Sequence, residues 1–220
     1  MTATRKCRLV VLISGRGSNL QAILDQAASG ELPVDIVAVI SNRPGVQGLE
    51  RARQASVPAL ELDHKAFPDR PEFETALSKL IDRQYPDLVI LAGFMRILTP
   101  GFTGHYRGRL LNIHPSLLPK FPGLHTHERA LTAGDTEHGA TIHFVTEELD
   151  GGPIIVQARV PVLPNDDPDT LAARVLAQEH RLYPQAIRWF AEGRVRLAGE
   201  QVEFDGQPLT APLRLESFAG

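Results

Sequence analysis

Short runs of apolar residues alternate with amphipathic segments through the first half of the chain. Residues 9–13 form a continuous leucine and β-branched run, which is typical of a strand buried on both faces. Apolar residues at positions 20, 23, 24 and 27 then recur at helical spacing, and Gly30 lies just past the predicted end of that helix. The same criteria predict strands at 36–40, 59–62 and 88–92 and helices at 48–55 and 71–84. This alternation predicts an α/β fold with a doubly wound, mostly parallel sheet and helices on both of its faces.

The second half of the chain has a different pattern. Residues 110–114 predict a fifth strand, and no helix separates the longer strands predicted at 139–146 and 153–162, so we expect an antiparallel extension of the sheet. A long helix over 168–192 has Pro168 in its first turn and is expected to bend near Pro184. Residues 195–209 alternate and contain Asp205-Gly206, which favours a small hairpin. We predict a single domain over 1–220, with halves at about 9–110 and 111–192 and a tail at 193–220.

Composition restricts the function further. The chain has 220 residues, of which 43% are hydrophobic and 22% charged, and its net charge of −3 argues against nucleic acid or an anionic membrane as the main partner. Cys7 is the single cysteine, so no intrachain disulfide can form and a reducing cytoplasm is the expected setting. The apolar run at 9–13 is too short for a signal peptide, and no segment has the length of a transmembrane helix.

A glycine-rich turn, Gly15-Arg16-Gly17-Ser18-Asn19, joins the first predicted strand to the first predicted helix. Backbone amides at the start of a helix favour an anion, so this turn is a candidate phosphate loop, with Ser18 as the expected helix cap. Leu20 stands where a dinucleotide-binding motif has its third glycine, and Ser41 and Asn42 stand where it has an acidic residue, which disfavours a nicotinamide cofactor. The alternative is an ordinary tight turn, since such turns also favour Gly, Ser and Asn.

Two polar residues lie on one face of the fifth predicted strand. Asn112 and His114 occupy alternate positions near its carboxyl end, where ligands bind in open α/β sheets. An amide donor can stabilise an oxyanion, and a histidine can exchange a proton near neutral pH. Asp150 precedes Gly151-Gly152 in a predicted turn, and if it reached His114 its charge would favour the protonated imidazole. The alternatives are a structural hydrogen-bond network for the pair and a solvated turn for the aspartate.

Several histidines cluster in this part of the sequence, at positions 114, 125, 127, 138 and 143, and raise the possibility of a zinc site. The sequence has no H-E-x-x-H helix and no cysteine cluster, so we expect no metal. We expect His105 and His138 to be surface residues and His143 to lie on a strand.

Four segments resemble the phosphoribosylglycinamide formyltransferase family. They are VLISGRGSNLQAI at 11–23, LAGFMRIL at 91–98, LLNIHPSLLPKFPGLHTH at 110–127 and HFVTEELDGGP at 143–153. The N-x-H-P-S-L-L-P phrase is specific to folate-dependent formyltransferases, and the P-G-L-H-T-H continuation narrows the resemblance to the glycinamide branch. It spans about residues 9–190, in matching order and spacing.

The resemblance implies a formyltransferase-type fold and transfer of a formyl group from 10-formyltetrahydrofolate to glycinamide ribonucleotide in purine synthesis. It also implies site residues, with His114 as the general acid and Asp150 as its partner. The implied positions are catalytic Asn112, His114 and Asp150; substrate-binding Gly17, Ser18, Asn19 and Glu179; and folate-binding Arg70, Met95, Arg96, Ile97, Leu98, Asn112, Thr146, Glu147, Glu148, Leu149 and Asp150. Arg16 and Leu176 depart from the family pattern, because smaller or polar residues are expected there.

Three other functions remain as alternatives. A non-catalytic sensor of a phosphorylated metabolite would need the glycine-rich turn but none of Asn112, His114 or Asp150. A formyltetrahydrofolate hydrolase usually has an extra regulatory domain, for which the chain has no room. Transfer to initiator methionyl-tRNA would need a further nucleic-acid-binding domain and a basic surface. The pattern does not distinguish a monomer from a homodimer.

Overall fold

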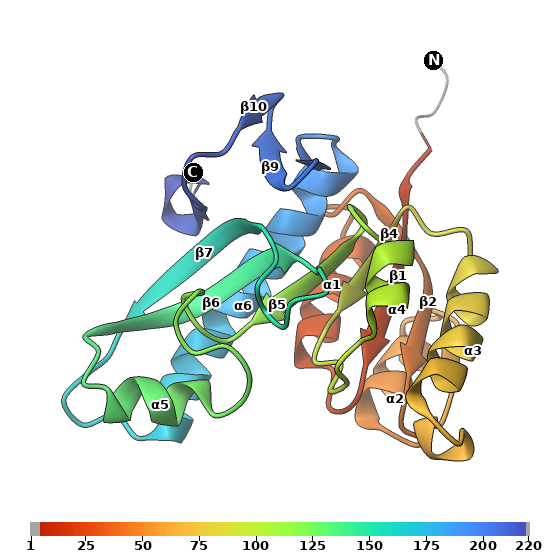
Figure 1. Cartoon of the computed structure of the whole chain (residues 1–220), viewed down its shortest axis with the longest axis horizontal. Helices are drawn as coiled ribbons and strands as arrows, with labels where there is room; N and C mark the ends of the chain where they lie inside the picture. The colour runs from red at the N-terminus through yellow and green to blue at the C-terminus, as the bar shows by residue number, and fades with distance from the viewer. Residues whose placement is uncertain (1–4, 219–220) are drawn as a thin grey trace. The chain divides into compact units, whose positions relative to one another are not determined.

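The computed structural model describes residues 5–218 and divides into two compact units, Met1–Leu111 and Asn112–Gly220. Strands and helices alternate through the first unit, whereas the second contains long neighbouring strands and one long helix (Figure 1). The strand pairs of the first unit are parallel, whereas the second unit contains a long antiparallel pair and a small antiparallel sheet. The α/β fold and its antiparallel extension are therefore confirmed.

The first unit is built on parallel strands in the order β4-β1-β2-β3. Their bounds are β1 Cys7–Ile13, β2 Val34–Ser41, β3 Ala59–Glu61 and β4 Leu88–Leu91. The apolar run at 9–13 and all of β4 are buried, as expected of strands covered on both faces. The chain moves outward from β1 to β3 and then returns to the other side of β1. This reversal places a topological switch point between the carboxyl ends of β1 and β4, where open sheets bind ligands.

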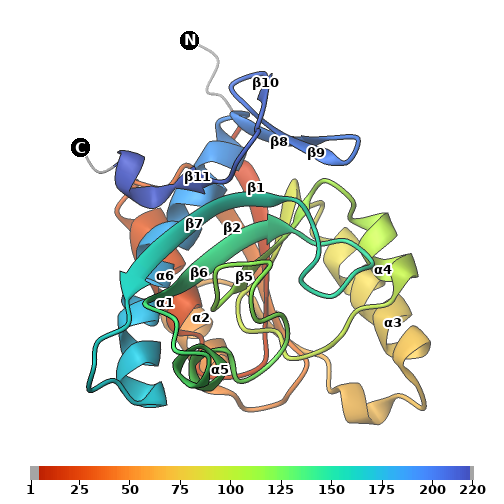
Figure 2. The same cartoon turned by 60° about the vertical axis from the view of Figure 1, so that its left-hand side comes forward.

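Helices cover both faces of these strands, with α1 and α2 on one side and α3 and α4 on the other (Figure 2). Their bounds are α1 Ser18–Ala28, α2 Gln47–Gln54, α3 Arg70–Asp82 and α4 Pro100–His105, and a short 3-10 helix, η1, spans His64–Ala66. Sequence patterns did not predict α4 because its six residues are too few to show a helical period. It starts with Pro100 after the Thr99 cap, whose hydroxyl accepts from the amide of Phe102.

Strand β5 (Leu110–His114) begins in the last residues of the first unit and continues into the second. The strands of this part of the sheet lie in the order β5-β6-β7-β11. The strand β6 (Glu137–Phe144) pairs antiparallel with β7 (Ile154–Pro161), and β11 (Leu213–Arg214), which we did not predict, pairs parallel with β7. Helix α6 (Pro168–Ala191) packs on β6 and β7 (Figure 1). It begins with a capping box in which Asp167 and Thr170 bond reciprocally.

The predicted terminal hairpin is part of a larger sheet. Strands β8 (Val195–Ala198), β9 (Gln201–Phe204) and β10 (Gln207–Pro208) form a three-stranded antiparallel sheet. Asp205-Gly206 is the turn between the last two of these strands, with both residues at positive φ. The chain ends its described part in a 3-10 helix, η2 (Leu215–Phe218). Among residues 5–218, no helix is long and apolar enough to cross a membrane.

Candidate active site

The glycine-rich turn after β1 is shaped by its backbone. Gly17 occupies the N-cap position of α1 with φ 70°, a left-handed conformation that glycine adopts at little cost. A Cβ on Gly17 would lie 2.9 Å from the Cα of Gly48, so the turn has no room for a side chain there. The prediction that Ser18 caps the helix is wrong, because Ser18 is its first residue and no side chain caps this end. The first-turn amides therefore keep their capacity to bind an anion.

The turn lines a pocket of about 290 Å³ in the first unit, at the switch point between β1 and β4. Ser14 through Asn19 contribute one side, and Arg43, Ala92, Gly93 and Met95 contribute the rest. The buried Ser14 hydroxyl joins the segments: it donates to Asn42 Oδ1 at 2.5 Å and accepts from the amide of Met95 at 2.8 Å. The pocket thus combines amides and an arginine, a combination that suits a phosphate.

The first-unit positions that the resemblance assigns to folate lie on two segments. Arg70 is the first residue of α3, and Met95 to Leu98 follow β4. Met95 and Ile97 are 61% and 54% exposed, whereas Leu98 is buried. The buried carboxylate of Glu74 fixes the end of this segment, because it accepts from the amide of Thr99 at 3.0 Å and from its hydroxyl. Arg96 lies over the ring of Phe73, 5.4 Å from its centroid.

In the second unit, the structure brings Asn112, His114 and Asp150 together. His114 Nδ1 lies 3.4 Å from Asp150 Oδ2, and these two side chains are 7% and 9% exposed. His114 Nε2 lies 2.9 Å from the carbonyl oxygen of Phe121. Nε2 therefore donates to this carbonyl, while Nδ1 lies within ion-pair distance of the carboxylate. The interpretation of Asp150 as a solvated turn residue does not hold.

His143 is a member of this cluster that the sequence analysis placed only on a strand. Its Nε2 lies 3.1 Å from Asn112 Nδ2 and 3.9 Å from Asp150 Oδ1. Burial lowers the pKa of His143 to about 4, so the ring is neutral at pH 7 and its Nε2 can accept a hydrogen from Asn112. Its Nδ1 lies 3.0 Å from its neighbour's carbonyl, that of Phe144, which fixes the tautomer. Since His143 and Asn112 are 31 residues apart, only their spacing on neighbouring strands could have suggested the contact.

The turn Asp150-Gly151-Gly152 presents the carboxylate to this cluster. Asp150 has φ 53°, a left-handed conformation that Asp tolerates better than most residues. A Cβ on Gly152 would lie 1.8 Å from the carbonyl oxygen of Phe144, so only glycine fits against the end of β6. Asp150 Oδ2 also accepts from the amide of Gly123 at 2.8 Å. The preceding residues that the resemblance assigns to folate, Thr146, Glu147, Glu148 and Leu149, lie in the same connection between β6 and β7.

Two further histidines of the second unit, His127 and His138, contact each other. His127 lies on helix α5 (Thr126–Thr132), which is too short to show a helical period in the sequence. Its Nδ1 lies 3.1 Å from Nε2 of His138. His138 is 1% exposed, so the prediction of a surface residue is wrong; β6 is buried along nearly its whole length. Burial lowers the pKa of both rings, that of His138 to about 4. The described residues contain no group of three or more His, Cys, Asp or Glu that could hold a metal ion.

Glu179 lies on the buried side of α6. The positions Leu171, Val175 and Glu179 follow one another at helical spacing, and the carboxylate is 7% exposed. Leu176, one of the two departures from the family pattern, is half-buried on the preceding turn, and Arg16, the other, lines the loop pocket.

Comparison with known proteins gives consistent results. Residues 7–187 match the family model described as formyl transferase. The chain is 55% identical to the phosphoribosylglycinamide formyltransferase of Escherichia coli (strain K12), over 91% of this chain and 95% of that protein. The solved structure of a phosphoribosylglycinamide formyltransferase from Coxiella burnetii is 52% identical, covers 96% of this chain and 99% of its own, and has a TM-score of 0.91. A formyltetrahydrofolate deformylase from Burkholderia mallei is 31% identical, covers 91% of this chain and 70% of its own, and has a TM-score of 0.83.

Proposed function

Because the chain belongs to the formyl transferase family, we propose that it transfers the formyl group of 10-formyltetrahydrofolate to the amine of glycinamide ribonucleotide. The products are formylglycinamide ribonucleotide, which is an intermediate of purine biosynthesis, and tetrahydrofolate, which is the folate without its formyl group. The proposal rests above all on the cluster in which Asp150 lies beside His114 while Asn112 contacts His143. A protein that only bound a phosphorylated metabolite would have no use for this cluster.

The reaction is an acyl transfer. The amine nitrogen attacks the formyl carbon, a C–N bond forms and the carbonyl oxygen becomes an oxyanion. The bond from that carbon to N10 of the folate then breaks, and N10 leaves with a proton. No covalent bond to the enzyme is required, so the protein has to orient the reactants, stabilise the oxyanion and move a proton.

Asn112 and His114 supply the donors for the oxyanion. The amide nitrogen of Asn112 carries two hydrogens, of which the contact with His143 uses one. His114 Nδ1 lies 3.4 Å from Asp150 Oδ2, which is longer than an N–H···O hydrogen bond, so a hydrogen on Nδ1 is available to an oxyanion. Donors of this kind each lower the activation barrier by about 3 kcal/mol.

Asp150 takes part in the proton transfer and holds His114 in place. Its carboxylate lies 3.4 Å from His114 Nδ1 and orients the imidazole, and it can accept the proton that the attacking amine loses, directly or through a water. Protonation of the departing N10 completes the transfer, so the proton count of the site is restored after each turnover.

Binding is divided between several positions. Gly17, Ser18 and Asn19 hold the phosphate of the ribonucleotide through the amides at the start of α1, and Glu179 contacts the same substrate. Arg70, Met95 to Leu98 and Thr146 to Asp150 contact the folate. In this proposal the protein acts in the cytoplasm on two small molecules as a monomer or homodimer, without a metal, and residues 1–220 form one catalytic domain.

The formyl-transfer assay tests this function. Purified protein is mixed with 10-formyltetrahydrofolate, and the absorbance change is followed with and without glycinamide ribonucleotide. This change reports the release of tetrahydrofolate after the formyl group has left it. We expect release to depend on the ribonucleotide. Release that proceeds equally without it would indicate the hydrolase, and saturable binding of the ribonucleotide without release would indicate the sensor.

A further inference from the structure

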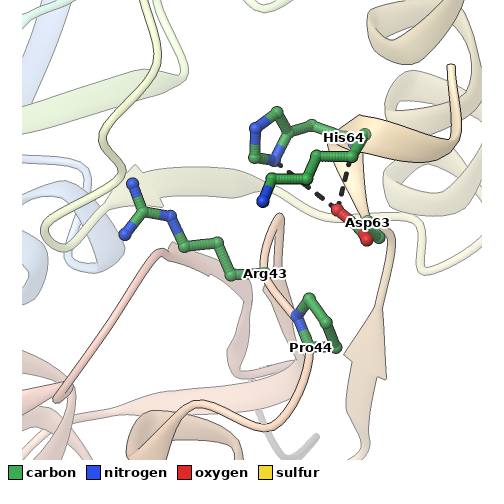
Figure 3. Close-up of a pocket in the computed structure, with 5 residues that line it drawn as sticks. Arg43, Pro44, Asp63 and His64 are labelled. Atoms are coloured by element: carbon green, nitrogen blue, oxygen red, sulfur yellow. Dashed lines mark hydrogen bonds and ion pairs between the residues drawn. The ribbon is translucent and has the colours of Figure 1, made fainter.

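The first unit has a second pocket, of about 430 Å³. Of the residues that line it, only Arg43 also lines the loop pocket. The second pocket is lined by Arg43 and Pro44, which follow β2, and by Asp63, His64 and Lys65, which follow β3 (Figure 3). The register that pairs Ser41 with Glu61 explains the meeting of these two loops, because it brings the carboxyl ends of β2 and β3 level with each other.

The charge in this pocket is mainly positive. Arg43 and Lys65 are exposed, and within residues 5–218 neither cation has a carboxylate at ion-pair distance. Asp63 is the one carboxylate in the lining, and it is already engaged: it accepts from the amide of Lys65 at 3.0 Å and lies 3.8 Å from His64 Nδ1. Two cations thus face one carboxylate, and the cations keep their capacity to bind an anion.

The walls of the pocket are held in place by partly buried hydrogen bonds. The backbone of Arg43 is fixed by Ser41, whose hydroxyl accepts from its amide at 3.1 Å and donates to its carbonyl at 2.7 Å. The ring of His64 donates through Nδ1 to the carbonyl of Asn42 at 2.8 Å. Asn42, which is 1% exposed, in turn accepts from Ser14 of the loop pocket. Little ordering of the loops is therefore needed when a ligand binds.

From this geometry we infer that the pocket of Arg43, His64 and Lys65 binds the phosphate group of a small molecule. Its position at the end of the second strand is where doubly wound folds recognise a ribose, with an acidic residue for a free hydroxyl or an arginine for a phosphate. This chain has no acidic residue at positions 41 and 42 and has Arg43 next in sequence. An arginine fork and a lysine point charge from two loops match a phosphate dianion.

The site is distinct from the phosphate loop. Its ligand groups are side chains after β2 and β3, whereas the loop pocket adds the amides after β1, and Arg43 is the residue that lines both pockets. The inference does not depend on formyl transfer, and its test uses no folate, so its failure and the failure of the proposed function can be told apart.

The test is a titration of the whole chain with inorganic phosphate, followed by NMR. The ring resonances of His64 report this pocket and the amide of Ser18 reports the loop. We expect a saturable shift of the His64 ring whose dissociation constant rises about tenfold in Lys65→Ala and in Arg43→Gln. Lys79→Ala, which removes an exposed lysine from α3 in the same unit, is the matched control and should leave the constant unchanged.

A second titration with ribose 5-phosphate distinguishes the source of the phosphate. Tighter binding than that of inorganic phosphate assigns the pocket to a phosphorylated sugar, and equal or weaker binding assigns it to the free ion. The inference is overturned if neither probe shifts the ring saturably. It is also overturned if the shift keeps its midpoint in both Lys65→Ala and Arg43→Gln, because the shift would then be relayed from the loop through Asn42.

Discussion

The glycine-rich loop of the first unit and the histidine cluster of the second are built in different ways. The loop is made of backbone: Gly17 adopts φ 70° at the start of α1, and its neighbours offer amides. The cluster is made of side chains from β5, β6 and the turn at Asp150. A backbone site holds a ligand, whereas ionisable side chains can exchange protons with it. On the proposed function, the loop therefore serves ground-state binding and the cluster serves the chemical step.

The largest effect is expected from His114→Ala. Loss of the acid and oxyanion donor should lower kcat by about 1,000-fold, while the KM for folate changes by less than about threefold. Steady-state kinetics with both substrates measure this. His125→Ala, which removes an imidazole that is 75% exposed, is the matched control. A kcat within tenfold of the parent value would remove His114 from the chemistry.

Asp150→Asn should lower kcat by about 100-fold. The amide keeps an oxygen for the bond with Gly123 but loses the carboxylate that accepts a proton from the attacking amine. Single-turnover measurements isolate the chemical step. Glu137→Gln, in an exposed ion pair with Arg159 of the same unit, should have the parent rate. Equal rates for the two variants would contradict the role of Asp150.

The histidine cluster should also make stability depend on pH. Burial lowers the pKa of His143 to about 4 from 6.5, so the folded state binds fewer protons than the unfolded state between these values. The stabilisation is complete above pH 6.5 and is lost as the pH falls towards 4. The free energy of unfolding, measured in urea, should fall between pH 7 and pH 5 by about 2 kcal/mol less in His143→Gln than in the parent. Parallel pH profiles for the two proteins would be inconsistent with a neutral, buried His143.

The smallest effect should be that of Gly17→Ala. The left-handed backbone and the close approach of Gly48 leave no room for the methyl group, so the turn must move. The KM for glycinamide ribonucleotide should rise about tenfold with little change in kcat. Gly104→Ala, in α4 of the same unit and outside the loop pocket, is the control, because its Cβ would meet no atom within 4 Å. A fall in kcat alone would contradict the division between binding and chemistry.

The same contrast explains what could be predicted from the sequence. The strand, turn and helix of the loop are contiguous, so local patterns located them, although the Ser18 cap was wrong. Asn112 and His114 share one strand and were placed together by alternation. The contacts of Asn112 with His143 and of His114 with Phe121 join separate segments, which local patterns do not relate. His138 was misjudged because a polar residue on a strand buried on both faces has no apolar alternation to reveal it.

The most direct measurement of the central claim follows the formyl carbon itself. The protein is incubated with 10-formyltetrahydrofolate labelled with ¹³C in the formyl group and with glycinamide ribonucleotide, and the products are examined by ¹³C NMR. The account predicts that the label appears in the formamide of formylglycinamide ribonucleotide, and that His114→Ala abolishes its appearance over the same time. Label recovered as formate, or left on the folate by the parent protein, would contradict it.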